Sequence, residues 1–390
     1  MARQPFSQII PNLFHDSGPP LHYFLARFDS VVALRWMSLV FAAIQFVLVM
    51  RKSLLGAALL AVYPPAVLFA ADARAYALCA LLVTAGVIAL DAERPLLAAA
   101  LLVLAAYSHS YGVLLFPVLL LDRKGFRALF AAIVLFLPGF FLAFHQPAQA
   151  LRWNRESLLA PLANLSFAGM YPYALFAAAP LALVVIALAL LVIALWRPVW
   201  RPVSRPAIAV LLPLGLVTAF HLAGRPVYFP MRFEAVIAGP LALWLGRSLC
   251  QWPRHARQLI AAGLLLMGSL TISLAIADHL GRPLDAYREA ALGLRGTSET
   301  VVATGYLYLE TVVALNRPVI AWPAEQAQHP GWRATLPPDP HALPPGPFLW
   351  VGERYAPELR VLREARSLRP LFWNERALVA RAPGLTPPVH

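Results

Sequence analysis

Long apolar runs separated by short polar segments dominate the first 277 residues. Runs of roughly 15–24 residues are typical of helices that span a bilayer core about 30 Å thick. The pattern predicts ten such helices, at 31–50, 53–70, 76–90, 95–108, 110–121, 128–145, 173–196, 207–223, 233–249 and 258–277. The two runs within 95–121 are short, so one long span over that range is the alternative.

The distribution of basic residues decides between the two alternatives. With ten helices, alternate short loops carry twelve basic residues: Arg51, Lys52, Arg94, Arg123, Lys124, Arg127, Arg197, Arg201, Arg205, Arg247, Arg254 and Arg257. The intervening short loops carry five: Arg74, Arg152, Arg155, Arg225 and Arg232. A single span over 95–121 would move the Arg123 cluster to the other side. Because cytoplasmic loops carry the excess of Lys and Arg, we expect ten helices, basic loops in the cytoplasm, and both chain ends outside.

Composition agrees with a membrane protein. The chain is 60% hydrophobic and only 13% charged, whereas soluble domains carry about 25% charged residues. The net charge of +13 does not point to nucleic acid, because the basic residues lie in short loops between apolar runs. Cys79 and Cys250 are isolated and form no disulfide framework or metal-ligand cluster. The sequence also lacks the glycine-rich loops that hold nucleotides.

The sequence changes character after residue 277. Short β-rich runs, TVVATGYLYL, RPVIAWP, PFLWVGE and RALVARA, alternate with polar, proline-rich turns, and helical patterns lie near 285–295 and 357–366. The expected fold class is therefore an α-helical polytopic membrane protein with a small C-terminal α/β domain. Its expected parts are an outer loop over 1–30, a transmembrane domain over 31–277 and an extracytoplasmic domain over 278–390.

Acidic residues are scarce in the membrane part. Five fall at the predicted outer face: Asp16, Asp29, Asp72, Glu156 and Glu234. Three others, Asp91, Glu93 and Asp122, lie beside arginines in predicted cytoplasmic loops and are expected to be solvated. Ionisable groups near membrane depth are costly, which makes the outer group functional candidates.

Two of these acids lie in short polar motifs. Asp16 opens DSGPPLHY, where it is either an active-site carboxylate or a helix N-cap in front of prolines. Asp72 and Arg74 lie in ADARAY, between two apolar runs. They form either a tight turn with an ion pair or an acid and a base that face a polar head group.

Three further candidates lie at predicted outer turns. His109, in YSHSYG, is either a structural residue at the apex of two short helices or a contact for a metal or phosphate. Arg232, in VYFPMRFEAV, can hold a phosphate in a bidentate fork or act as a snorkelling anchor, and Glu234 can neutralise it. Tyr228 suits the aromatic belt at the interface.

Taken together, these motifs resemble those of the GT-C glycosyltransferases that use polyprenyl-phosphate donors. This superfamily includes protein O-mannosyltransferases, RgtA/B/C/D-like transferases and lipid A aminoarabinose transferases. The segments HDSGPPLHYFL, ADARAYAL, AAYSHSYGVLL and VYFPMRFEAVIAGPLAL resemble the family's motifs in order, spacing and predicted outer-face placement. The resemblance covers residues 12 to about 245, with a looser match in the C-terminal tail.

The resemblance implies an inverting transfer of a sugar from a polyprenyl phosphate to an envelope acceptor. The acceptor stays open between a lipid, a polysaccharide and a protein, and a divalent metal cation is an optional cofactor. The active site and C-terminal domain would lie on the periplasmic side of a bacterial inner membrane. The implied roles are carboxylate catalysis for Asp16 and Asp72, donor-phosphate binding for Arg74, Arg232 and Tyr228, and metal or phosphate contact for His109. Membrane lipid is an expected partner; nucleic acid is not.

One feature of the family motif is missing. In the family an Asp-Glu pair follows the first helix and is the leading candidate for the base, whereas this sequence begins beyond that point. We therefore expect a further helix upstream of Met1. The alternative functions are a transporter or lipid flippase, or an inactive glycosyltransferase-like protein. Against a transporter, the acids cluster at one face and the two halves show no visible similarity.

Overall fold

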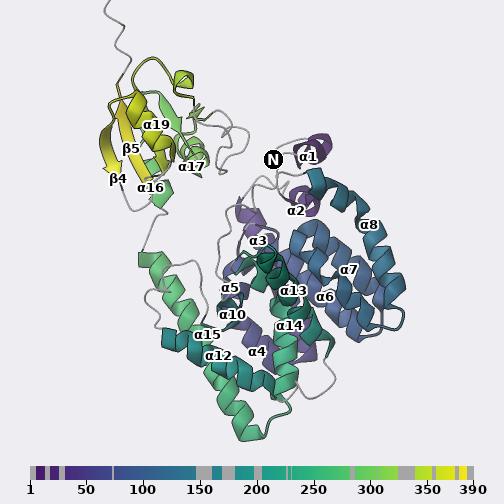
Figure 1. The fold of residues 1–390 in the computed structure, drawn as a ribbon. Coiled ribbons are helices and arrows are strands. Elements are labelled where there is room, and N and C mark those ends of the chain that lie inside the picture. The colour runs from purple at the N-terminus through teal and green to yellow at the C-terminus, as the bar shows by residue number, and fades with distance from the viewer. Residues whose placement is uncertain are drawn as a thin grey trace, which may run out of the picture. The chain divides into compact units, whose positions relative to one another are not determined.

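The computed structural model describes residues 6–13, 18–25, 31–72, 74–145, 160–168, 181–196, 204–224, 227–229, 231–281, 286–304, 306–323, 339–353, 357–373 and 377–383. The chain divides into two compact units, Met1–Ala277 and Asp278–His390. Each unit is described by itself (Figure 1).

The described part of the first unit is built from helices. They are α1 (Phe6–Leu13), α2 (Pro20–Leu25), α3 (Val31–Lys52), α4 (Leu54–Ala61), α5 (Pro64–Ala70), α6 (Tyr76–Asp91), α7 (Pro95–Ser108), the 3-10 helix η1 (Ser110–Leu121), α8 (Gly125–His145), α10 (Ala160–Leu165), α12 (Leu181–Trp196), α13 (Arg205–Leu222), α14 (Arg232–Leu249) and α15 (Arg254–Gly281). Within the described residues, parts of α3, α8, α13 and α15 are long and apolar enough to cross a membrane. Helices α6, α7, η1 and part of α12 are apolar but shorter. The protein is thus a polytopic α-helical membrane protein.

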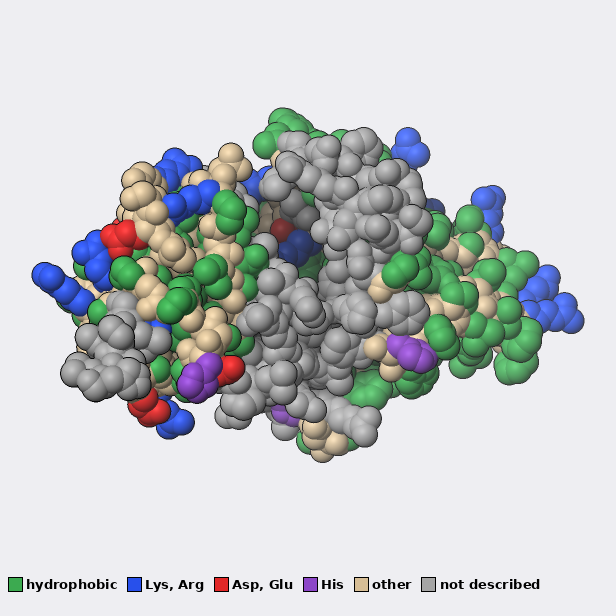
Figure 2. All heavy atoms as spheres, turned by 90° about the horizontal axis from the view of Figure 1, so that it is seen from above, with side chains coloured by type: hydrophobic (Ala, Val, Ile, Leu, Met, Phe, Trp, Pro, Cys, Tyr) green, Lys and Arg blue, Asp and Glu red, His purple; other side chains and the backbone are tan. Residues whose placement is uncertain are grey.

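The predicted spans coincide with helices, with two differences in detail. The range 53–70 is two helices, α4 and α5, because Pro64 and Pro65 open α5 and cannot continue a helix from α4. The predicted span at 173–196 is described from Leu181 onward. Hydrophobic side chains cover much of the described surface of this unit, and Lys and Arg side chains project from its margin (Figure 2). This is the surface expected of a protein in lipid.

The chain reverses at His109, so α7 and η1 are two antiparallel helices. His109 is extended, with φ −150° and ψ 138°, and ends α7. Gly112 then packs so close to α7 that an added Cβ would lie 2.4 Å from the backbone nitrogen of Ala106. One long span over 95–121 is therefore excluded, as the distribution of basic residues predicted.

Helix α14 is the centre of the helical unit. It contacts α3, α4, α5, α6, α12, α13 and η1, and each of its residues other than Arg232 and Arg247 is buried. The two exceptions lie near its two ends. At 1.5 Å per residue the helix is about 27 Å long, close to the thickness of a bilayer core.

The end of the bundle that carries Arg247 is tied by ion pairs. Arg247 binds Asp91 at the end of α6. Arg205, at the start of α13, lies 3.7 Å from Asp122 and donates to the carbonyl of Leu90 at 2.6 Å. The expectation that Asp91 and Asp122 are solvated was wrong: their side chains are only 17% and 11% exposed. Helix packing brings an arginine from a helix distant in the sequence to each carboxylate.

The second unit is a small α/β domain with a five-stranded sheet in the order β2-β1-β3-β5-β4. The strands are β1 (Val301–Ala303), β2 (Ile320–Ala321), β3 (Phe348–Glu353), β4 (Arg369–Trp373) and β5 (Ala377–Ala382). Strand β1 is parallel to β2 and β3, while β5 is antiparallel to β3 and β4. The helices are α16 (Ala286–Leu292), α17 (Tyr306–Leu315), η3 (Pro340–Ala342) and α19 (Pro357–Ala365).

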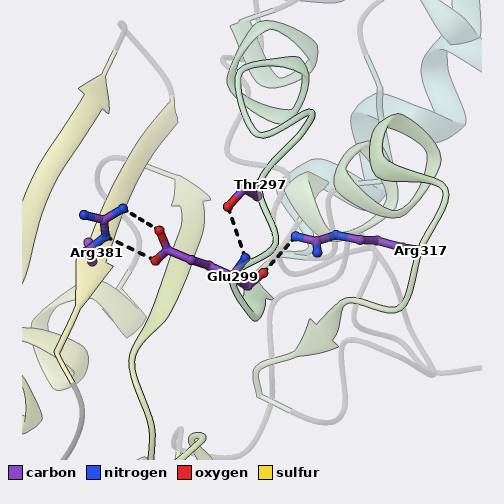
Figure 3. A network of polar contacts seen from close by, with 4 residues as sticks. All are labelled: Thr297, Glu299, Arg317 and Arg381. Atoms are coloured by element: carbon purple, nitrogen blue, oxygen red, sulfur yellow. Dashed lines mark hydrogen bonds and ion pairs between the residues drawn. The ribbon is translucent and has the colours of Figure 1, made fainter.

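Alternating side chains give this sheet two apolar faces. Phe348 and Trp350 pack with Leu359 and Leu362 of α19, whereas Leu349 and Val351 pack with Ala290 of α16 and Leu307 of α17. A polar network joins the segment before β1 to β5 and to the residues after α17 (Figure 3). Glu299 binds Arg381 of β5 through an ion pair, and its carbonyl accepts a hydrogen bond from Arg317 at 2.8 Å.

Candidate functional site

Tyr76 marks the second end of the bundle, opposite the Arg247–Asp91 pair. Helices α6 and α14 begin together there, because Tyr76 opens α6 and the guanidinium of Arg232, the first residue of α14, lies over its ring at 5.9 Å. Arg74 hydrogen-bonds with the Tyr76 side chain, and the charges of Asp72 and Arg232 also act on it. The turn before α6 and the start of α14 therefore form one polar cluster.

His109 belongs to the same cluster. Its ring lies 5.0 Å from the ring of Tyr76 and 4.8 Å from that of Tyr111. The Nδ1 atom accepts the backbone N–H of Tyr111 at 3.2 Å, so in the neutral ring Nε2 carries the proton. Burial, together with the charges of Arg232 and His22, lowers the pKa of His109 from 6.5 to about 3. The ring is therefore neutral at physiological pH and has one N–H left to donate.

Arg232 is held by aromatic rings. Besides Tyr76, its guanidinium lies over the ring of Phe229 at 5.4 Å from the centroid. Rings attract a cation without cancelling its charge, so Arg232 keeps the capacity to bind an anion. Arginine suits phosphate in particular, because its planar fork matches two phosphate oxygens.

The segment in front of Arg232 is tightly fixed. The hydroxyl of Tyr111 donates to the carbonyl of Val227 at 2.9 Å and accepts the N–H of Phe229 at 2.8 Å. Met231, the N-cap of α14, has φ +62°, a left-handed conformation that costs a non-glycine residue about 1–2 kcal/mol. Such conformations persist where the surroundings determine them and cluster at functional sites.

Beneath Arg232 lies a buried polar chain. Asn164 donates from Nδ2 to the hydroxyl of Tyr228 at 2.8 Å, and this hydroxyl donates to Oε1 of Glu234 at 2.6 Å. The backbone carbonyl of Asn164 accepts the hydroxyl of Tyr63 at 3.2 Å. Burial, followed by the nearby carboxylate of Glu234, raises the pKa of Tyr228 and keeps its hydroxyl protonated. Tyr228 is 1% exposed, so its hydroxyl faces this chain and not the surface.

The structure brings four of the six predicted site residues into one cluster: Asp72, Arg74, His109 and Arg232. Tyr228 lies beside them but is turned inward. Asp16 lies outside the described residues. Within the described part of the chain, no three His, Cys, Asp or Glu side chains come together as a metal site would require.

Several residues of the cluster were missed in the sequence. His22, on α2, lies near enough to His109 for its charge to act on that ring. Helix α2 is placed by a small apolar group in which its Tyr23 and Phe24 pack against Ile9 and Leu13 of α1 and Leu142 of α8. The motif DSGPPLHY contained His22, and nothing distinguished it from an interfacial residue. Asn164 and Tyr111 gave no signal at all, since their partners are more than 60 residues away.

Two solved structures resemble this chain over nearly its whole length. They are the crystal structures of ArnT from Cupriavidus metallidurans in the apo state and bound to undecaprenyl phosphate. Their TM-scores are 0.56 and 0.57, and in both cases the identity is 14%, with 96% of this chain and 92% of that chain covered. No family model and no curated protein matches the sequence. The similarity shows that the chain shares the fold of these ArnT structures, in agreement with the polytopic fold that the sequence predicted.

Proposed function

We propose that the protein is a GT-C glycosyltransferase that moves a sugar from a polyprenyl phosphate to an acceptor in the cell envelope. One observation carries the proposal: the cluster of Asp72, Arg74, His109 and Arg232 at one end of an apolar bundle with this fold. Support for the donor class comes from the ArnT structure that binds undecaprenyl phosphate. A prenyl chain can lie in lipid beside the bundle while its phosphate reaches the cationic cluster.

The residues then divide the chemistry. Arg232 and Arg74 bind the donor phosphate, and the Nε2–H of His109 donates a hydrogen bond to it. Asp72 accepts the proton of the acceptor hydroxyl as its oxygen forms a bond to the anomeric carbon. The bond from that carbon to the phosphate oxygen breaks, and the polyprenyl phosphate leaves with the electron pair. A positioned base typically increases the reaction rate 10²–10⁴-fold. Fixed cations next to the charge that develops on the phosphate increase the rate further.

The side of the membrane follows from the two ends of α14. The end with Arg247 also carries the basic loops that the positive-inside rule assigns to the cytoplasm. The end with Arg232 therefore faces the periplasm of a bacterial inner membrane. The C-terminal unit follows α15, whose other end lies at the basic side, so this unit is also assigned to the periplasm.

The test is a comparison of envelope glycans by mass spectrometry. Strains would lack the gene or carry it as wild type, Asp72→Asn, Arg232→Ala or Arg254→Ala. Arg254 is the matched control, since it is an exposed arginine that opens α15 as Arg232 opens α14. We expect one sugar to disappear with deletion and with Arg232→Ala, and to fall at least about 100-fold with Asp72→Asn.

Protein levels in the membrane must match between strains for this comparison. Arg254→Ala should leave the glycans as in wild type. Identical glycans in the deletion and wild-type strains, across all envelope fractions, would refute a transferase. The result would then favour the transporter or flippase reading, which requires no new covalent bond.

A further inference from the structure

Glu234 is placed unlike any other described acid in the helical unit. Among the described residues of that unit it is the one charged residue that is fully buried, at 0% exposure. It lies in the first turn of α14, two residues after Arg232. A buried carboxyl group is costly unless hydrogen bonds compensate it, so its presence in the first turn of the buried helix α14 calls for a role.

Neutralising Arg232 is not that role in this structure. Oε1 of Glu234 accepts the hydroxyl of Tyr228 at 2.6 Å, while the guanidinium of Arg232 lies over the rings of Tyr76 and Phe229. Among the residues that the structure describes, no ion pair involves Arg232. The two side chains therefore face different surroundings despite their closeness in sequence.

We propose that Glu234 is a positioning residue: through Tyr228 it fixes residues 227–229, and these residues aim Arg232 at the donor phosphate. The inference rests on the proposed function. Glu234 does not touch the donor in this account. Tyr228, predicted from the sequence to bind the phosphate, instead belongs to the support beneath Arg232.

Two separate hydrogen-bonded clamps hold the segment. On one side, the Tyr228 hydroxyl sits between Asn164 of α10 and Glu234 of α14. On the other, the Tyr111 hydroxyl from η1 binds the carbonyl of Val227 and the N–H of Phe229. The left-handed turn at Met231 then converts this fixed segment into the start of α14. Loss of either clamp would let the cation move relative to the rings of Tyr76 and Phe229.

The clamp needs an oxygen acceptor at position 234, not a negative charge. Glutamine offers the same acceptor in the same place, whereas leucine offers none. Glu234→Gln should therefore preserve function, and Glu234→Leu should impair it. A charge-based role for Glu234 predicts that both substitutions impair it.

The experiment measures how strongly the protein distinguishes a phosphate. Purified full-length protein in nanodiscs is titrated with undecaprenyl phosphate and with undecaprenol. The readout is the Kd for undecaprenol divided by the Kd for undecaprenyl phosphate. A general loss of folding would weaken the binding of both ligands. Misplacement of Arg232 would weaken only the binding of undecaprenyl phosphate. The variants are Arg232→Ala, Glu234→Leu, Glu234→Gln, Tyr228→Phe, the Arg232→Ala/Glu234→Leu double variant, and Glu93→Gln as a control at an exposed acid in the turn before α7.

We expect Glu234→Leu and Tyr228→Phe to lower the ratio about tenfold, which corresponds to about 1.4 kcal/mol. Glu234→Gln and Glu93→Gln should resemble wild type. The double variant should fall no further than Arg232→Ala alone, because residues that act through one another are not additive. Tyr228→Phe tests the same clamp if Glu234→Leu fails to accumulate.

Three results would overturn the inference: wild-type ratios in both Glu234→Leu and Tyr228→Phe, equal loss in Glu234→Gln and Glu234→Leu, or full additivity in the double variant. A wild-type protein that binds undecaprenol and undecaprenyl phosphate equally would instead refute the proposed donor site itself. The inference about Glu234 would fall with it.

Discussion

At the scale of single residues, burial and neighbouring groups determine the protonation state of a side chain. His109 is the clearest case, because it caps η1 with Nδ1, contacts two tyrosine rings and lies near Arg232. Its lowered pKa, about 3, means that the folded protein resists protonation of this ring. An unfolded chain would take up that proton near pH 6.5.

This difference predicts a pH dependence of stability. Between about pH 6.5 and about pH 3 the unfolded state binds a proton that the folded state does not, so the His109 contribution destabilises the fold progressively as pH falls. In His109→Asn, which keeps a cap at this position, that contribution should vanish. Thermal unfolding of both proteins from pH 7.5 to pH 4.5 measures it. Parallel curves for the two proteins would contradict the lowered pKa.

Arg232 carries a second prediction at this scale. Replacement by lysine keeps the charge but loses the planar fork and the stacking on Tyr76 and Phe229. We expect Arg232→Lys to retain part of the transfer activity, between wild type and Arg232→Ala, in the glycan assay. Full activity in Arg232→Lys would show that charge alone suffices and that the geometry of the fork is irrelevant.

At the scale of elements, small residues let α14 approach its neighbours closely. An added Cβ at Gly246 would lie 2.2 Å from Oγ of Ser53 and 2.9 Å from the backbone nitrogen of Gly56. One at Gly239 would lie 1.9 Å from Oγ1 of Thr84. Small residues at helix contacts are typical of membrane bundles, where close backbone packing takes over from the hydrophobic effect. These close contacts within the bundle fix α14, and α14 in turn carries Arg232 at its first position.

Gly246→Val should therefore destabilise the bundle. The valine side chain would push α14 away from the backbone of α4, and overpacking of this kind costs typically 1–3 kcal/mol. Gly215→Val in α13 is the matched control, because no atom lies within 4 Å of a Cβ there. Thermal unfolding in detergent should give a lower Tm for Gly246→Val than for Gly215→Val. Equal Tm values would contradict the close contact between α14 and α4.

The sequence predicted most elements but not their fine structure. Apolar runs located the spans, and basic residues separated α7 from η1. The break at Pro64 and Pro65 within 53–70 was missed. TVVATGYLYL was predicted as a β run, yet only 301–303 is a strand and α17 begins at Tyr306. Strand β4 was missed because it is a largely exposed edge strand without alternation. Among site residues, Asp72, Arg74, His109 and Arg232 could be identified because they lie in polar turns between apolar runs. The partners of Tyr228 could not, because they depend on tertiary packing.

At the scale of the whole helical unit, the described ion pairs and the Tyr76 cluster lie at opposite ends of α6 and α14. An apolar length of about 24–27 Å separates them. In the proposed function, the ion pairs anchor the bundle at one membrane surface and the Tyr76 cluster carries the chemistry at the other. This arrangement differs from a transporter, whose ionisable groups lie near the midplane.

Cysteine labelling tests this sidedness. Cys250 is exposed at the basic end, while Cys79 is buried. In intact cells, with access through the outer membrane, a membrane-impermeant maleimide should leave Cys250 unlabelled. It should label Ala223→Cys, at an exposed site after α13 on the other side, in a Cys250→Ser background. Labelling of Cys250 from outside, or failure at position 223 with success after lysis, would invert the assigned topology.

The central claim is that a polyprenyl phosphate binds at the start of α14. A cryo-electron microscopy map of the full-length protein in nanodiscs with undecaprenyl phosphate would test it most directly. The account predicts phosphate density in contact with Arg232, beside Arg74 and His109, and the prenyl chain against the lipid-facing helices. Density for the lipid phosphate at the Arg247 end, or at neither end under saturating lipid, would contradict the claim.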